Sequence, residues 1–113
     1  MKVDIIATDF FEIRFKKLKK KYKTLLEELL DLQTELSLNP SMGTDLGNGL
    51  HKIRLASKSK GKGKSGGFRV ITYLVVESKI ETTIYLITIY DKSEEENITK
   101  QELLKLVKYI FEE

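Results

Sequence analysis

Residues 61–77 read "GKGKSGGFRVITYLVVE", a glycine and lysine segment that leads directly into ten residues rich in β-branched and aromatic side chains. Such side chains favour strands, and this stretch lacks the apolar spacing of a helix. Glycine-rich loops that bind nucleotide phosphates need a helix immediately after the glycines, because its free N–H groups hold the phosphate. The stretch therefore predicts a strand from Phe68 onward and argues against a nucleotide site.

The segments on either side predict two consecutive helices before this strand and one helix after it. Apolar residues repeat at helical spacing through residues 9–22 and again from Leu25 to Leu36, with a stop at residues 39–40, "NP". Thr99 and Glu102 have the spacing of a capping box, which predicts that a closing helix begins at residue 100.

The remaining segments predict a small sheet. Strands are expected at residues 3–8, 50–57, 68–77 and 80–90, with a tight turn at residues 78–79. Residues 41–49, "SMGTDLGNG", are glycine-rich and are expected to form a loop. The expected fold class is α+β, with an N-terminal helical hairpin and a C-terminal helix packed on a small antiparallel sheet.

Composition limits the domain count and the compartment. The chain has 113 residues, of which 41% are hydrophobic, so residues 1–113 are expected to form one domain. Cysteine is absent, which suits a reducing cytoplasm. Acids interrupt the apolar run at the N-terminus, and no apolar run approaches the length of a membrane span. We expect a cytoplasmic protein with no signal peptide and no membrane partner.

The positive charges are concentrated in one part of the chain. No acid lies between Asp45 and Glu77, whereas this interval holds seven cations: Lys52, Arg54, Lys58, Lys60, Lys62, Lys64 and Arg69. Because the whole chain carries a net charge of +3, the rest of it carries −4. A concentrated cationic zone on an otherwise acidic chain is typical of a protein that binds a polyanion. A solvated lysine-rich loop is the alternative.

The period of a strand places some of these cations together. Lys52 and Arg54 lie two residues apart, so they share one face of their strand, and His51 points to the other. Arg69 lies near them if its strand returns antiparallel. Such cations repel one another, which indicates an anionic ligand, although pairing with an acid such as Asp45 or Glu77 is an alternative.

Three segments carry a resemblance to a known family: "LHKIRLA" at residues 50–56, "GKGKSGGFRVITY" at 61–73 and "ITIYDKSEEENIT" at 87–99. With the preceding helical hairpin, they make the chain resemble the RelE/HigB-like toxins of bacterial toxin–antitoxin systems. The resemblance implies a small endoribonuclease that enters the ribosome, cuts mRNA during translation and is inhibited by a cognate antitoxin. It also implies that the ribosome and mRNA are partners, and that no cofactor is needed.

The resemblance also assigns candidate residues. By position, the family's strand lysines fall on Lys52 and Arg54, its central arginine on Arg69 and its late basic residue on Lys92. Arginine guanidinium groups suit the phosphate, because each presents paired donors. Lys52 and Lys92 are candidates for base and acid, in either order, and Tyr90 is a candidate for stacking on a base or donating its hydroxyl. The lysines of the glycine-rich segment are expected to supply affinity for ribosomal RNA: Lys58, Lys60, Lys62 and Lys64.

Two rival functions remain open at this point. Toxins resembling ParE share the fold, inhibit DNA gyrase and lack the cationic set, and a non-catalytic RNA-binding module would use the same cations without cleavage. Some members of the family carry a histidine or tyrosine near the C-terminal end, whereas residues 93–98 read "SEEENI". No group of His, Asp or Glu shows the spacing of metal ligands, so cleavage without a metal is expected.

Overall fold

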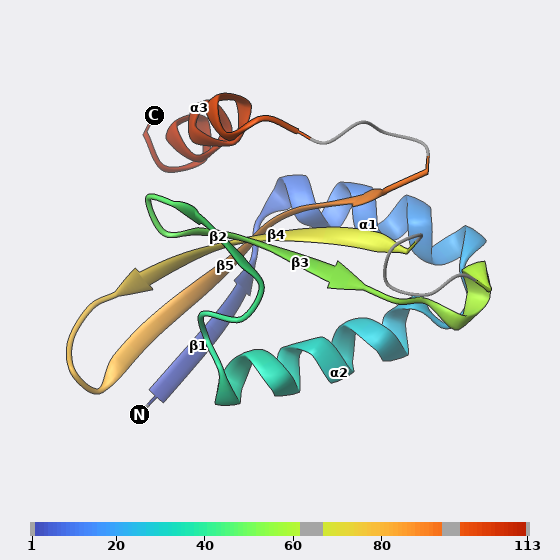
Figure 1. Ribbon diagram of the computed structural model, residues 1–113, viewed down its shortest axis with the longest axis horizontal. Helices are drawn as coiled ribbons and strands as arrows, with labels where there is room; N and C mark the ends of the chain where they lie inside the picture. Colours follow the sequence, from blue (N-terminus) through green and yellow to red (C-terminus); the bar gives the residue numbers. More distant parts are fainter. Residues whose placement is uncertain (1, 62–66, 94–97, 113) are drawn as a thin grey trace.

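The computed structural model describes residues 2–61, 67–93 and 98–112 (Figure 1). These residues contain five strands in the spatial order β1-β5-β4-β3-β2. The strands are β1 (Lys2–Ala7), β2 (Thr44–Gly47), β3 (Leu50–Leu55), β4 (Phe68–Val76) and β5 (Glu81–Asp91). The helices are α1 (Asp9–Lys21), α2 (Leu25–Leu38) and α3 (Lys100–Phe111), with a short 3-10 turn, η1, at Lys58–Lys60.

The α1–α2 hairpin covers one face of the sheet. Apolar residues at helical spacing on both helices are buried against strand residues of that face: Phe11, Phe15, Leu25, Leu29, Leu32 and Leu36. Thr8 begins α1, because its side chain accepts a hydrogen bond from the N–H of Phe11. The predicted apolar stripes of residues 9–36 therefore form the larger of the two core clusters.

The third helix covers the opposite face, near the β2–β3 turn (Figure 1). Leu103 of α3 is buried with Leu50, Ile71 and Ile87 from three different strands. Thr99 accepts a hydrogen bond from the N–H of Glu102, as the capping-box spacing predicts. The α+β fold class is thus confirmed, with helices on both faces of one sheet. No helix among the described residues is long and apolar enough to cross a bilayer.

The sheet differs from the expected one in two respects. β1 pairs parallel to β5, so the sheet is mixed, and the other neighbouring strands are antiparallel. The expectation of a loop at residues 41–49 was wrong in part, because Thr44–Gly47 forms β2 and pairs with β3. The turn between them carries three positive φ angles, at Gly47, Asn48 and Gly49. Asn-Gly favours this conformation, which closes a tight hairpin.

One irregularity divides β5 into two parts. Ile71 pairs with Thr88 and Thr72 pairs with Leu86, so Ile87 is an extra residue in β5. β1 pairs with β5 only as far as Leu86, where Thr8 donates its N–H and its hydroxyl to the Leu86 carbonyl. β5 then continues beyond the end of β1 to Asp91.

A buried ion pair joins the segment after β3 to the end of β5. Lys60 and Asp91 form a salt bridge, with side chains that are 6% and 2% exposed. The hydroxyl of Tyr22, just after α1, donates to the other carboxylate oxygen at 3.1 Å. Ser93 donates to Asp91 from both its N–H and its hydroxyl. Three segments distant in sequence therefore meet at one carboxylate.

This arrangement fixes the charge state of Asp91. Burial acts to raise the pKa of Asp91, but hydrogen bonds from Lys60 and Ser93 outweigh burial and lower that pKa from 3.8 to about 2. The carboxylate therefore stabilises the fold above its unfolded-state pKa, and this contribution is lost as the pH falls towards the folded-state value.

We predict a specific acid sensitivity from this pKa. The shift in the pKa of Asp91 contributes about 2 kcal/mol to the free energy of unfolding. Most of this contribution should be lost between about pH 5 and about pH 2.5. Urea denaturation at the two pH values measures the loss. Asp91→Asn should already be destabilised at neutral pH, because it leaves Lys60 buried without its countercharge, and it should lack this part of the acid dependence. The control is Asp31→Asn, on the exposed side of α2. This variant should lose the same stability on acidification as the wild type. Equal acid dependence in all three proteins would contradict the assignment.

Candidate functional site

The register of three adjacent strands places two arginines and a tyrosine side by side. Arg54 of β3 lies directly opposite Arg69 of β4, and Arg69 lies directly opposite Tyr90 of β5. Lys52 is two residues from Arg54 and pairs with Ile71. Side chains of one face alternate with those of the other, so these residues share the face that carries α3. We call Lys52, Arg54, Arg69 and Tyr90 the cationic row.

The members of the cationic row differ in exposure. Arg54 is exposed and Lys52 is half-buried, whereas Arg69 is only 3% exposed. One guanidinium nitrogen of Arg69 donates to the carbonyl of Phe68 at 3.2 Å. Burial lowers the pKa of Arg69, and the nearby charge of Arg54 lowers it further, while Tyr90 acts in the opposite direction. The fold thus holds two guanidinium groups close together, one of them away from water.

Tyr90 departs from one of the expected roles. It is 1% exposed and belongs to the apolar cluster under α3. A ring buried to this extent is not available for stacking on a base.

The end of β5 carries the last candidate. Lys92 lies immediately after Asp91, and its N–H donates to the carbonyl of Gly67 at 3.2 Å. Gly67 itself lies against the carbonyl of Leu55, at a distance that leaves no room for a Cβ. The start of β4 is therefore held between the ends of β3 and β5, and Lys92 lies two residues from Tyr90.

The lysines of the glycine-rich segment do not form a uniform group. Lys58 is exposed, and its N–H donates to Glu28. Lys60 is buried in its salt bridge and also lies over the rings of Tyr22 and Phe68. This placement argues against Lys60 as a phosphate-binding group, because its charge is already used inside the fold. Lys62 and Lys64 lie outside the described residues.

His51 lies on the other face from the cationic row. It is buried, and its Nδ1 is 3.3 Å from the carbonyl oxygen of Gly49. This position agrees with the alternation expected along β3. His51 therefore lies away from the candidate site.

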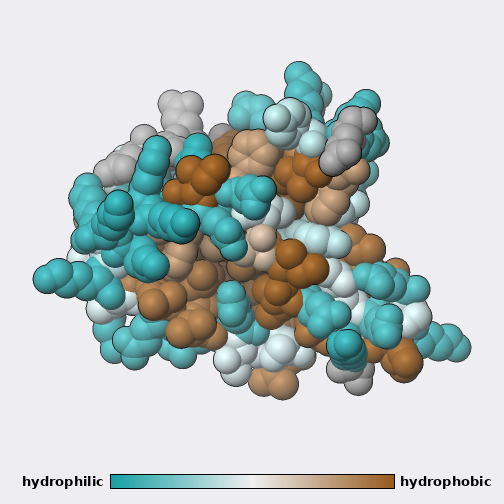
Figure 2. Space-filling view, turned by 180° about the vertical axis from the view of Figure 1, so that it is seen from behind, coloured by the Kyte–Doolittle hydropathy of each residue, from teal (hydrophilic) through white to brown (hydrophobic). Residues whose placement is uncertain are grey.

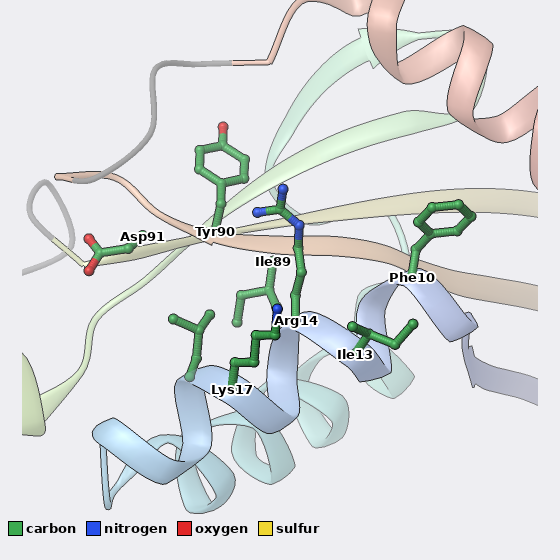
Figure 3. Close-up of a pocket in the computed structure, with 8 residues that line it drawn as sticks. Phe10, Ile13, Arg14, Lys17, Ile89, Tyr90 and Asp91 are labelled. Atoms are coloured by element: carbon green, nitrogen blue, oxygen red, sulfur yellow. The ribbon is translucent and has the colours of Figure 1, made fainter.

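Sequence reasoning missed one cation near the row. Arg14 of α1 extends past the edge of β5 towards Tyr90 (Figure 3), and both residues line the same groove. The available signal was the basic run "RFKKLKKKYK" at residues 14–23, which was interpreted only through its apolar residues. α1 thus supplies a second cationic surface beside the sheet.

The chemistry of this arrangement suits a phosphate diester. Paired guanidinium groups can bind two oxygens of a phosphate, and partial burial strengthens their interaction with negative charge. Among the residues that the structure describes, no three His, Cys, Asp or Glu side chains form a group that could hold a metal ion. The described site therefore offers cations, hydroxyl groups and amines as its functional groups.

Two comparisons with known proteins agree with this fold. The family model of the RelE toxin of the RelE/RelB toxin–antitoxin system matches residues 9–111. The structure is similar to that of a double arginine-to-alanine mutant of the Escherichia coli toxin RelE in the free state, with a TM-score of 0.57 and 17% sequence identity. That match covers 98% of this chain and 100% of the other. The chain belongs to the RelE family of toxins from toxin–antitoxin systems.

Proposed function

We propose that this toxin cleaves mRNA on the ribosome, without a metal ion, and thereby inhibits translation. One observation carries the proposal: Arg54 and Arg69 lie directly opposite each other on adjacent strands, with Lys52 and Tyr90 beside them. Like charges directly opposite each other on adjacent strands destabilise a sheet, and an anionic ligand bound between them would offset this repulsion. Family membership supports a toxin, and the cationic row supports RNA as its substrate.

The proposed reaction transfers the phosphate within the RNA. The 2′-oxygen of one nucleotide attacks the adjacent phosphorus and gives up its proton, and the 5′-oxygen of the next nucleotide leaves and takes up a proton. The products are a 2′,3′-cyclic phosphate and a 5′-hydroxyl. Negative charge grows on the phosphate oxygens in the transition state, where fixed cations act most strongly.

The residues of the site have distinct proposed roles. Arg54, which is exposed, binds the phosphate as it arrives from solvent. Arg69 stabilises the transition state from its less hydrated position beside Arg54. Lys52 and Lys92 are the proposed proton-transfer groups, and the chemistry accepts either as the base. The hydroxyl of Tyr90 is a further donor.

We predict that Arg69→Met strongly reduces RNA cleavage but leaves the protein folded. Burial and the charge of Arg54 both oppose the charged form of Arg69, and their loss offsets the loss of its hydrogen bond to the Phe68 carbonyl, so the variant should stay folded with little change in thermal stability. Cleavage on programmed ribosomes should fall by at least about a hundredfold, because a fixed donor to the phosphate is lost. Mapping of mRNA ends and thermal melting measure the two effects.

The control for this variant is Lys79→Met, in the turn between β4 and β5, which should cleave like the wild type. A folded Arg69→Met protein with full activity would contradict the role of Arg69. Gyrase supercoiling assays and gel shifts with RNA, run on the wild type, separate the two rival functions: inhibition of gyrase supports a ParE-like toxin, and RNA binding without cut ends supports a binding module.

We also predict different effects for lysines of the glycine-rich segment. Changing Lys58, Lys62 and Lys64 together to serine should weaken ribosome binding and reduce its dependence on salt, by about 0.7 in logarithmic slope for each phosphate that the variant no longer neutralises. Lys60→Ser should instead lower the free energy of unfolding, because it leaves Asp91 buried without its partner. Binding measured at several salt concentrations, with urea denaturation, distinguishes the two. An unchanged slope in the triple variant would overturn the proposal for this segment.

A further inference from the structure

The two helices of the α1–α2 hairpin carry opposite net charges. α1 (Asp9–Lys21) has six cations and two acids, which gives a net charge of +4. α2 (Leu25–Leu38) has four acids and no cation, which gives a net charge of −4. Both helices pack on the same face of the sheet and contact each other, so a positive strip lies next to a negative one.

The outer side of α1 combines its positive charge with an exposed apolar side chain. Ile13, Lys16 and Lys20 lie opposite the buried Phe11 and Phe15, because helical spacing separates the two groups. All three outer residues are exposed, and the exposed fraction of Ile13 is 60%. α1 therefore presents a basic surface with an apolar side chain to solvent.

α2 repeats this arrangement with acids in place of lysines. Glu27, Leu30 and Asp31 lie away from the buried Leu29 and Leu32, and all three are exposed. The exposed fraction of Leu30 is 54%. We call the exposed residues on the outer side of the two helices the outer face: Ile13, Lys16, Lys20, Glu27, Leu30 and Asp31.

The outer face has the composition of an interaction surface. Figure 2 shows apolar side chains gathered next to hydrophilic ones on the side of the molecule seen from behind. Exposed apolar side chains bordered by polar ones are typical of surfaces that bind a partner. Among the residues that the structure describes, no ion pair joins Lys16 or Lys20 to Glu27 or Asp31. These charges are therefore available to another molecule.

The two strips of charge select the kind of partner. RNA or an acidic peptide would be attracted to α1 but repelled by α2, and a basic partner would show the reverse preference. A second copy of this chain satisfies both helices at once. A two-fold axis that runs along the hairpin, parallel to both helices, places α1 of each copy on α2 of the other.

The positions of the charges along the hairpin fit this symmetry. Lys20 and Glu27 lie at similar distances from the turn between α1 and α2, and Lys16 and Asp31 lie at similar, larger distances from it. With α1 placed on α2 of a second copy, each lysine therefore faces an acid. Each contact occurs twice, because the interface is symmetric.

We infer that two copies of this chain associate through the outer face as a symmetric dimer, with α1 of each on α2 of the other. The exposed isoleucine and leucine side chains are covered by this contact, and the charges fix the orientation of the copies. Exposed ion pairs contribute little free energy and are weakened by salt, so the dimer is weak and sensitive to salt. The dimer covers the lysines on the outer side of α1, so it excludes RNA from that surface.

Sedimentation velocity of the full-length chain measures the association. The wild type should be a monomer at about 1 μM and should become increasingly dimeric towards about 500 μM, and added salt should shift it back towards the monomer. Leu30→Asp should raise the dissociation constant of the dimer at least about tenfold, because it places a carboxylate in the apolar part of the contact.

Exchange of charges tests the orientation of the two copies. Lys16→Glu with Lys20→Glu makes the outer residues of both helices acidic, and Glu27→Lys with Asp31→Lys makes them basic. Each double variant alone should remain a monomer over the same range of concentrations, because like charges then face each other. An equimolar mixture of the two should form a dimer, because acids again face lysines at every contact. Rescue in the mixture also shows that both variants are folded.

The matched control is Lys79→Glu with Lys105→Glu, which changes the net charge equally at exposed positions outside the hairpin and should dimerise like the wild type. The inference is overturned if the wild type stays monomeric, if the mixture fails to associate, or if each double variant dimerises alone. A monomeric wild type whose ribosome binding is weakened by Lys16→Glu with Lys20→Glu would assign the outer side of α1 to RNA instead.

Discussion

The pairing of β4 with β3 on one side and β5 on the other determines both the core and the candidate site. β4 is the central strand of five, and its alternate residues enter the two apolar clusters on opposite faces. The same register places Arg69 between Arg54 and Tyr90. A slip of one residue would exchange the faces, moving Arg69 into the cluster under the helical hairpin. The apolar residues that fix the register therefore also fix the site.

Much of the fold could be predicted because the signals are local. The apolar spacing of residues 9–36 predicts the hairpin, and Thr99 with Glu102 predicts where α3 begins. The β2–β3 hairpin was missed although Asn48-Gly49 is a strong turn signal, because β2 is only four residues long. The parallel pairing of β1 with β5 joins segments about 80 residues apart, and periodicity contains no information about such pairing.

Only the part of the candidate site that follows from the alternation of side chains along the strands could be predicted. Arg54 and Arg69 lie on consecutive strands, so their common face follows from period and connectivity. The groove lined by Arg14 and Tyr90 follows from neither, because it requires the end of β1, the bulge at Ile87 and the path of α1 together. Similarly, the sequence alone does not distinguish Lys58 from Lys60. The ion pair of Lys60 with Asp91 depends on the tertiary fold, which brings together residues distant in the chain.

The two buried cations Lys60 and Arg69 have different electrostatic surroundings. Lys60 has its charge met by Asp91, with Tyr22 and Ser93 completing the hydrogen bonds of that carboxylate. Burial and the nearby charge of Arg54 lower the pKa of Arg69, and Tyr90 raises it. The carboxylate of Asp91 offsets the free-energy cost of burying the charge of Lys60. The cationic row brings two guanidinium groups together on adjacent strands, so like charges face each other in the candidate site. A ligand with negative charge offsets such repulsion, and an RNA phosphate is the ligand that the proposed function supplies.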